Sequence, residues 1–343
     1  MNIYDISEKA GVSIATVSRV LNNSPHVSEA TRKKVLRVIQ KSNYVPNAFA
    51  RGLGLGSMKT IGLLCPDASD PYLSTALSLL EQSFRAHQYD CLLVCTGEGA
   101  EERSAGVRQL INRHVDGIVL MGSSFMESSE HAAALFRQSS GEVPVVLLGG
   151  DYTAPDVWCV HCDDQQITCE AVQELVAAGR RRILYLYHSR NYSGRKKLTG
   201  YRAGLESCGL EVDEALIRFV GHDKHDVLQL RDHLLDLYHA GLRFDAVMTS
   251  EDLLGIGALK FARAAGLRVP EDLAVLGYNN SNVCLCCEPE LSSIDNRLDD
   301  LCAAIVSTLL RVLSGDTEAA RQRVLSGRVV CRGSTPEAMR HLL

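Results

Sequence analysis

From Ile61 onward the chain alternates short apolar segments with amphipathic ones. Segments that are apolar throughout are typical of strands buried on both faces, as in parallel sheets covered by helices. Nine such strands over about 280 residues fit two doubly wound lobes better than one. We expect strands at 61–67, 91–97, 117–122, 144–150, 158–163, 182–188, 217–222, 245–250 and 273–279, with the clearest helices at 72–87, 101–113, 165–179, 226–240, 252–266 and about 297–314.

The amino-terminal residues follow a different, all-helical pattern. Asn2, Ser13 and Ser28 each stand where a side chain can cap the start of a helix. Gly11 suits the left-handed position at the end of the first helix, so that the second helix, 14–21, follows after a short turn. Two helices joined by such a turn predict a helix-turn-helix.

Charge is divided unevenly along the chain. Residues 1–58 hold eight basic and three acidic residues, a net charge of +5, whereas the remainder holds 28 basic and 38 acidic residues, a net charge of −10. A basic head on an acidic body indicates that only the head meets a polyanion. No apolar run reaches the roughly 18 residues of a membrane span, and no signal-peptide pattern precedes the head. We therefore expect a cytoplasmic protein that makes no contact with a membrane.

The second helix has the pattern of a recognition helix. Ile14, Ala15, Ser18 and Arg19 fall on its outward face near the helix start, which is the part that enters the major groove. Arg19 could bind a guanine edge through two hydrogen bonds, and apolar side chains could contact thymine methyl groups. The alternative is an unrelated three-helix bundle with a solvated arginine. Polar side chains suited to phosphate contacts are Tyr4, Ser13, Thr16, Asn22, His26 and Thr31.

Longer stretches resemble a known family. Residues 3–22, IYDISEKAGVSIATVSRVLN, followed by VSEATRKKV and NYVPNAFARGL, closely resemble the lactose/galactose-repressor (LacI/GalR) family of bacterial transcription regulators, and the core agrees in order and spacing to about residue 335. The resemblance implies a homodimer that binds a pseudo-palindromic operator in double-stranded DNA. It also implies a core of the periplasmic-binding-protein type, which binds a small-molecule effector. No heptad run follows the last core helix, so we expect a dimer and not a tetramer.

The same resemblance divides the chain into domains. It implies a helix-turn-helix domain at 1–46, a hinge at 47–58 and a two-lobed effector-binding and dimerisation core at 59–335. The N-lobe would comprise about 59–160 and 290–323, and the C-lobe about 161–289 and 324–335.

The resemblance implies that the hinge folds on operator DNA and inserts Leu53 into the minor groove, with Asn47 and Arg51 as further contacts. Gly52, Gly54 and Gly56 depart from a good helix, since each interior glycine costs about 1 kcal/mol relative to alanine. A flexible linker with no DNA role is the alternative.

Ligands of two-lobed α/β proteins bind between the lobes at the carboxyl ends of the strands. That rule and the family resemblance lead to the same loops. Four of these positions differ from the residue usual in the family. Lys197 stands in place of an arginine and Glu251 in place of an asparagine. Asn279 and Gly149 each stand in place of an aspartate. We therefore hypothesise that the effector, a sugar or related metabolite, is not a plain neutral hexose and carries an amine or other charge. The candidate effector residues are Asp70, Tyr72, Gly149, Lys197, Glu251, Asp252 and Asn279.

Three other functions compete with this interpretation. An enzyme would need an organised acid, base or nucleophile, but His161 and His188 are candidates by position only, so we expect no catalytic residue and no cofactor. A free-standing solute-binding protein would lack residues 1–58. A thiol or metal sensor could use the cysteines near Cys286 or the pair Cys159 and Cys162. In the expected strand at 158–163, the side chains of Cys159 and Cys162 lie on opposite faces, so this pair predicts no metal site.

Overall fold

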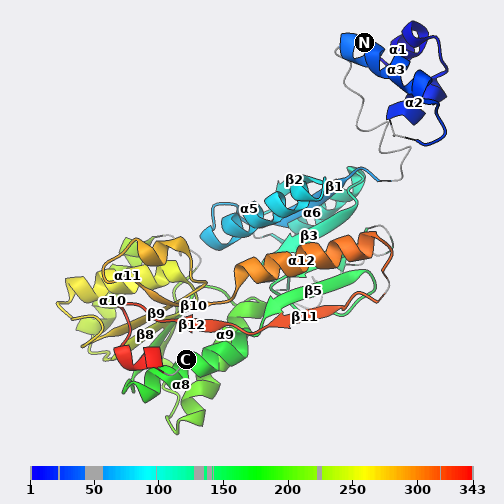
Figure 1. Cartoon of the computed structure of the whole chain (residues 1–343). Helices are drawn as coiled ribbons and strands as arrows, with labels where there is room; N and C mark the ends of the chain where they lie inside the picture. The colour runs from blue at the N-terminus through cyan, green and yellow to red at the C-terminus, as the bar shows by residue number, and fades with distance from the viewer. Residues whose placement is uncertain are drawn as a thin grey trace.

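The computed structural model describes residues 2–21, 24–42, 57–97, 99–126, 135–136, 141, 143–221, 226–316 and 318–341. Figure 1 shows a helical head and two α/β lobes, which confirms the predicted fold class. Within the described residues, no helix is both long and apolar enough to cross a bilayer.

In the described residues the head has three helices: α1 (Ile3–Ala10), α2 (Ile14–Leu21) and α3 (Glu29–Lys41). Asn2, Ser13 and Ser28 each accept a hydrogen bond from the backbone amide three residues further on, as the cap positions predict. Gly11 has a φ of 56°, the left-handed conformation that its place between α1 and α2 requires. The head has a small core of its own, made by Ile6, Ala10, Val17, Val20 and Val35.

The N-lobe is built on a six-stranded sheet in the order β11-β5-β4-β3-β1-β2, with every neighbouring pair parallel. Helices α5 and α12 cover one face and α6 covers the other. The elements are β1 (Thr60–Cys65), β2 (Asp90–Cys95), β3 (Gly117–Met121), β4 (Val145–Leu148), β5 (Val157–Cys162), β11 (Gln322–Leu325), α5 (Pro71–Ala86), α6 (Ala100–Asn112), α12 (Leu298–Leu313) and the short η1 (Ser123–Met126).

The C-lobe sheet has the order β12-β10-β9-β8-β6-β7, and only its β10–β12 pair is antiparallel. Helices α8 and α9 cover one face, and α10 and α11 cover the other. The elements are β6 (Ile183–Tyr187), β7 (Ile217–Phe219), β8 (Ala246–Thr249), β9 (Ala274–Tyr278), β10 (Ser292–Asp295), β12 (Arg328–Val330), α8 (Asp164–Ala177), α9 (Tyr192–Ser207), α10 (Val227–His239), α11 (Asp252–Ala264) and the short η2 (Glu214–Leu216), η3 (Asn282–Leu285) and η4 (Glu337–His341).

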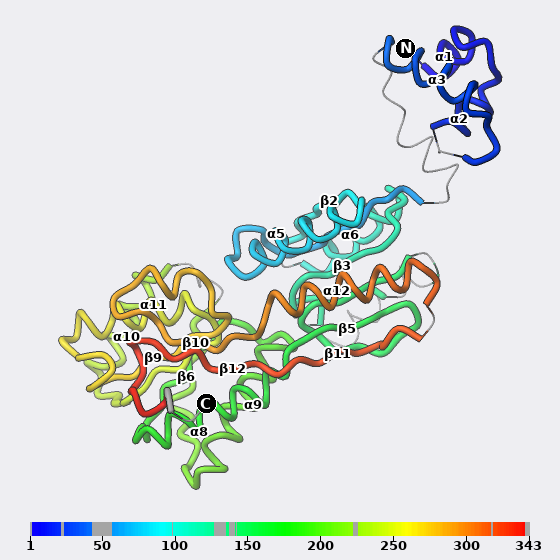
Figure 2. Tube along the Cα trace, in the orientation of Figure 1, coloured from blue at the N-terminus to red at the C-terminus, as the bar shows by residue number. Residues whose placement is uncertain are grey.

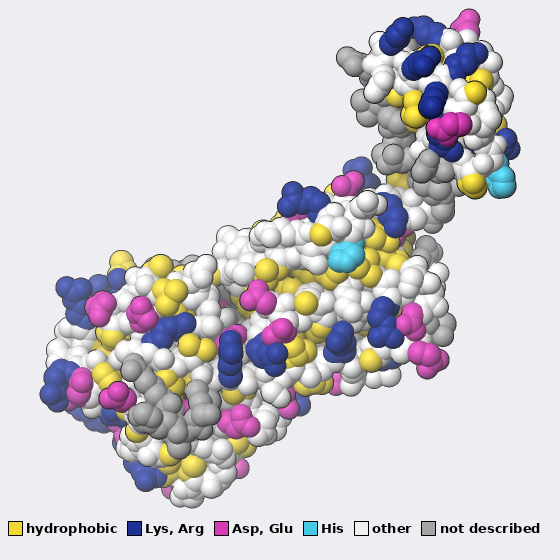
Figure 3. All heavy atoms as spheres, in the orientation of Figure 1, with side chains coloured by type: hydrophobic (Ala, Val, Ile, Leu, Met, Phe, Trp, Pro, Cys, Tyr) yellow, Lys and Arg dark blue, Asp and Glu magenta, His cyan; other side chains and the backbone are white. Residues whose placement is uncertain are grey.

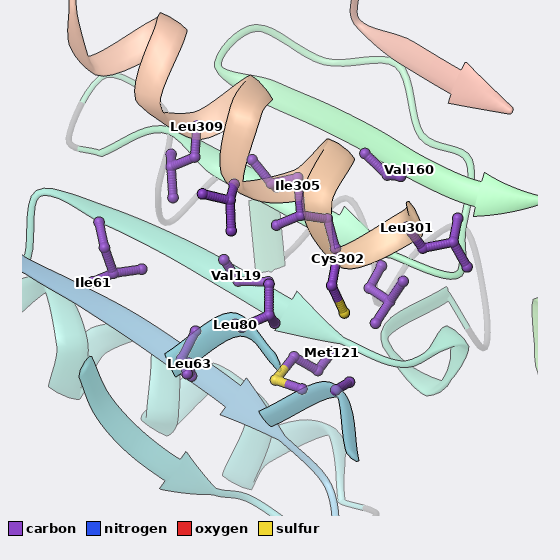
Figure 4. Close-up of a cluster of buried hydrophobic side chains, with 14 of the residues drawn as sticks. Ile61, Leu63, Leu80, Val119, Met121, Val160, Leu301, Cys302, Ile305 and Leu309 are labelled. Atoms are coloured by element: carbon purple, nitrogen blue, oxygen red, sulfur yellow. The ribbon is translucent and has the colours of Figure 1, made fainter. Parts of the chain in front are cut away.

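The apolar faces of strands and helices meet in closed cores. In Figure 4, side chains of β1 and β3 point toward those of α12, with Ile305 and Leu309 lying above Val119. All three of these side chains are fully buried. Burying one such side chain stabilises the fold by roughly 1.5–3 kcal/mol. These cores hold the strands of each sheet together and so set the order and spacing of the strand ends from which the loops leave.

The chain passes between the lobes three times (Figure 2). Strand pairing places the passages at 162–164, 295–298 and 325–328. The predicted boundaries near 160, 290 and 323 are therefore early, because β5 and β11 run further in the N-lobe and β10 pairs within the C-lobe sheet. The passages are adjacent: a Cβ atom on Gly327 would lie 3.1 Å from the carbonyl oxygen of Asp295 and 3.3 Å from Cys162 Sγ.

Among the α-helices and strands of the described residues, one helix and three strands were not foreseen. Strands β10, β11 and β12 have only three or four residues each, and β11 is largely exposed, so none shows the long apolar run of a central strand. Helix α9 contains Gly194, Gly200 and Gly204, which lower its intrinsic helix propensity. Gly200 and Gly204 permit close packing on α8, since a Cβ atom on Gly204 would lie 2.8 Å from the carbonyl oxygen of Cys169.

Candidate DNA-reading face and interlobe cavity

Helix α2 presents one exposed face and buries the other. Val17 and Val20 pack into the core of the head, whereas Ile14, Ala15 and Arg19 are exposed. Ser18 is half-buried beside them. The predicted base-reading positions therefore lie together on a helix that the rest of the head supports.

The predicted phosphate contacts lie around this face with mixed exposure. Tyr4 and His26 are exposed. Thr16 and Thr31 are half-buried, and each hydroxyl lies 2.9 Å from the hydroxyl of a capping serine, Ser13 or Ser28. Four predicted contacts lie outside the described residues: Asn22, Asn47, Arg51 and Leu53.

A basic strip on α3 had not been singled out as a contact surface. Side chains spaced three or four residues apart share one face of a helix, and on α3 this spacing brings four basic residues together. They line a shallow groove of about 430 Å³. Figure 3 shows Lys and Arg side chains gathered over the head. The four residues are Lys33, Lys34, Arg37 and Lys41.

A cavity of about 720 Å³ lies between the two lobes. It is lined by the loops that follow β1, β2, β3 and β4 of the N-lobe and β6, β8 and β9 of the C-lobe, together with residues at the lobe crossings. This is the location that the strand-end rule predicts. Of the seven predicted effector residues, six line it: Asp70, Tyr72, Gly149, Lys197, Glu251 and Asn279.

On the N-lobe side, the carboxylate of Asp70 caps helix α5. Its Oδ1 accepts hydrogen bonds from the amides of Tyr72, at 2.8 Å, and Leu73, at 3.1 Å. The positive end of the helix dipole stabilises a negative charge at this place. Burial raises the pKa of Tyr72, so its hydroxyl stays protonated and can donate a hydrogen bond.

On the C-lobe side, Lys197 occupies a fixed position. Its Nζ donates to the carbonyl oxygen of Ser250 at 3.0 Å and lies 3.5 Å from the centroid of the Tyr278 ring. Burial lowers the pKa of Lys197, while the carboxylates of Asp164 and Glu251 act against this shift. A cation over an aromatic face is stabilised by the ring quadrupole. The ammonium group of Lys197 is thus held by groups of the protein in the cavity wall.

His188 lies beside Ser250 and Glu251, an arrangement that invites comparison with a catalytic triad. A triad needs the serine on one ring nitrogen of the histidine and the carboxylate on the other. Here the same Nδ1 atom lies 3.2 Å from Ser250 Oγ and 3.5 Å from Glu251 Oε1. The geometry therefore does not organise Ser250 as a nucleophile.

Asp252 differs from the expectation that it faces the ligand. It is buried and does not line the cavity. Its Oδ2 accepts from the amide and the hydroxyl of Ser281, each at 2.7 Å, and its Oδ1 accepts from Ser293 Oγ at 2.6 Å. The carboxylate joins the start of α11 to η3 and β10, which is a structural role.

Sequence reasoning missed several polar residues of the cavity wall. Asn296 is 5% exposed, and its Nδ2 donates to Asn279 Oδ1 at 3.3 Å. Within the described residues, Asn296 Oδ1 and Ser124 Oγ are buried without a hydrogen-bond partner. Asp164 accepts from the hydroxyls of Tyr278 and Ser193, each at 2.5 Å. Asn296 directly follows β10, so recognising that strand would have led to it.

The two cysteine groups considered from the sequence lie in different surroundings. Cys284 is buried and Cys286 is exposed, while Cys159 and Cys162 are both buried in β5. Burial raises the pKa of Cys159 to about 11 and of Cys162 to about 12. In the part of the chain that the structure describes, no three His, Cys, Asp or Glu side chains are grouped as metal ligands.

Comparison with protein families agrees with this architecture. Residues 2–47 match the family described as bacterial regulatory proteins, lacI family. Residues 58–327 match the periplasmic binding proteins and sugar binding domain of the LacI family. The second match alone covers more than half of the chain.

Individual proteins are similar over nearly the whole length. An HTH-type transcriptional regulator of Lachnoclostridium phytofermentans is 45% identical, with 98% of this chain and 99% of that protein covered. Catabolite control protein A of Streptococcus mutans is 31% identical, with 98% of each covered.

Solved structures agree as well. The complex of the transcriptional regulator CelR with cellobiose is 28% identical, with a TM-score of 0.70 over 97% of this chain and 99% of that one. A lac repressor dimer bound to operator shares the fold, with a TM-score of 0.84 over 98% and 99% of the chains at 23% identity. The chain therefore belongs to the LacI family of bacterial transcription regulators.

Proposed function

We propose that this chain is a cytoplasmic, homodimeric repressor without enzymatic activity, whose affinity for operator DNA is set by a small molecule in the interlobe cavity. One observation carries the proposal: an exposed recognition face on a basic head is joined to a core with a polar cavity between two lobes. The shared Nδ1 of His188 supports the absence of catalysis.

The cavity offers a physical route from ligand to DNA. A ligand that touches both walls binds one arrangement of the lobes better than another, and only such differential binding can shift a conformational equilibrium. Three adjacent segments at 162–164, 295–298 and 325–328 join the lobes and would carry the change. The hinge at 47–58, with Asn47, Arg51 and Leu53, would transmit it to the operator.

The proposal is tested by selecting bound sequences from a random DNA pool with the purified full-length protein. We expect an inverted repeat whose affinity falls steeply with salt, because Lys and Arg side chains on phosphates release counterions. A duplex of the same composition with one half-site scrambled is the control. Selection of no inverted repeat, or equal affinity for the control, would contradict a dimeric operator reader.

We further propose that the effector carries a protonated nitrogen. Four carboxylates line the cavity, from Asp67, Asp70, Asp164 and Glu251, whereas its Lys and Arg residues are Arg190 and Lys197. Lys197 is buried against Ser250 and Tyr278. The Cζ atom of Arg190 lies 4.7 Å from the centroid of the Phe219 ring. A charged donor forms roughly twice as strong a hydrogen bond to a carboxylate as a neutral donor.

Matched sugars test this charge preference by calorimetry. We expect glucosamine or galactosamine to bind at least about tenfold more tightly than the hexose of the same configuration, a difference of about 1.4 kcal/mol. Glu251→Gln should reduce the difference, since it removes one carboxylate and keeps the size of the side chain. Tight binding of an unmodified hexose, with no gain from the amine, would be evidence against the proposal.

A further inference from the structure

Cys65 and Cys95 form a close pair in the N-lobe. They occupy the same register position at the carboxyl ends of the neighbouring parallel strands β1 and β2. Their Sγ atoms lie 3.9 Å apart. Neighbouring strands are about 4.8 Å apart, which falls within the Cα separation of roughly 4.4–6.8 Å found across disulfides. A bond between these sulfur atoms therefore requires rotation of the side chains and little movement of the strands.

The two thiols differ in access. Cys95 is exposed on β2, which is the edge strand of the sheet. Cys65 is fully buried in the apolar core between the sheet and helices α5 and α12. Burial raises the pKa of the Cys65 thiol to about 12, which protects it from direct oxidation. An oxidant in solution therefore reaches the Cys95 sulfur before the neighbouring, buried sulfur of Cys65.

The pair lies beside loops that line the interlobe cavity. The amide of Thr96 donates to the carbonyl oxygen of Cys65, and that of Gly97 to the carbonyl oxygen of Pro66, each at 2.9 Å. Pro66 and Gly97 belong to the cavity wall. A covalent bond between the sulfur atoms would fix these two loops to each other.

We propose that Cys65 and Cys95 form a reversible disulfide within one chain on exposure to a peroxide. The Cys95 thiolate attacks the peroxide oxygen and becomes a sulfenic acid, and the hydroxide that leaves takes up a proton to form water. The Cys65 sulfur then displaces the sulfenic hydroxyl, which leaves with the thiol proton as a second water. Two thiols are oxidised and one hydrogen peroxide is reduced to two waters. A dithiol reductant reverses the bond by exchange.

Peptide mapping of the full-length protein tests the pair directly. After one equivalent of hydrogen peroxide, free thiols are alkylated and the protein is digested without reduction. We expect a cross-linked peptide that joins Cys65 to Cys95, the loss of two of the twelve thiols per chain, and return of both with dithiothreitol. Cys65→Ser should leave a sulfenic acid on Cys95 that dimedone traps, whereas Cys91→Ser, a change in the same strand, should leave the cross-link unchanged.

Cys286 supplies an internal reference because it is also exposed. Oxidation of Cys286 before any Cys65–Cys95 link forms would overturn the proposal. So would a link from Cys95 to a second copy of the chain, or sulfinic acid on Cys95 in the wild-type protein. Far-UV circular dichroism establishes that the variants are folded, and the wild-type map is decisive without them.

Discussion

Arg19→Ala should remove most of the sequence preference of the operator complex and leave general DNA affinity nearly unchanged. Arg19 is exposed on the outward face of α2, while Val17 and Val20 of the same helix hold the head together. A two-point contact to a guanine edge is worth about 1–3 kcal/mol of discrimination. A dimer that uses both heads should therefore lose on the order of 10²–10⁴ in its ratio of specific to non-specific affinity.

Arg37→Ala is the matched control, since it removes the same charge from an exposed position in the basic strip of α3. A phosphate contact carries no sequence information, so this change should weaken binding to all duplexes alike and reduce the salt slope by about 2, one contact for each head of the dimer. Fluorescence anisotropy over a salt series, with selected and scrambled duplexes, separates the two effects. An equal effect of both variants on the two duplexes would argue against base reading by Arg19.

The head was predictable because its signals are local. Asn2, Ser13 and Ser28 cap helices through hydrogen bonds that span three residues, and Gly11 supplies a conformation that most side chains disfavour. The central strands were predictable for a similar reason, since burial on both faces requires a continuous apolar run.

Elements that depend on tertiary partners were not predictable in this way. Helix α9 contains glycines that weaken an isolated helix, yet those glycines let it approach α8, where a Cβ atom on Gly200 would overlap the carbonyl oxygen of Gln165. Strand β10 is recognisable mainly from its pairing with β9 and β12. Because β10 was missed, the lobe boundary was misplaced and Asn296 was overlooked.

The cavity could be located from the sequence, but the role of each residue in it could not. Glu251 and Asp252 are adjacent in sequence and both carry a carboxylate, yet Glu251 lines the cavity and Asp252 turns to Ser281 and Ser293. The side-chain direction depends on which donors the neighbouring loops bring close. That information becomes available only when η3 and β10 are placed.

Asp252→Ala should lower the stability of the core by about 2–3 kcal/mol. Removing the carboxylate takes away the acceptor of the amide and hydroxyl of half-buried Ser281 and the nearer of two acceptors of the buried Ser293 hydroxyl. A donor left unsatisfied away from water costs about 1–3 kcal/mol. For a core of about 280 residues, such a loss corresponds to a fall in Tm of about 3–5 °C. Differential scanning calorimetry measures it. Asp252→Asn should lose less, since an amide oxygen still accepts from one of these groups.

Glu251→Gln is the comparison for Asp252→Ala, because it changes the neighbouring carboxylate and tests for a role in ligand binding instead of a structural role. Glu251 lines the cavity, so its amide variant should change effector affinity with little change in Tm, the reverse of Asp252→Ala. If the Asp252 carboxylate has a structural role, its removal must lower the Tm, whether or not effector affinity changes. If Asp252→Ala instead kept the wild-type Tm and lost effector affinity, the carboxylate would be a ligand contact, and the hydrogen bonds to Ser281 and Ser293 would contribute little to the fold.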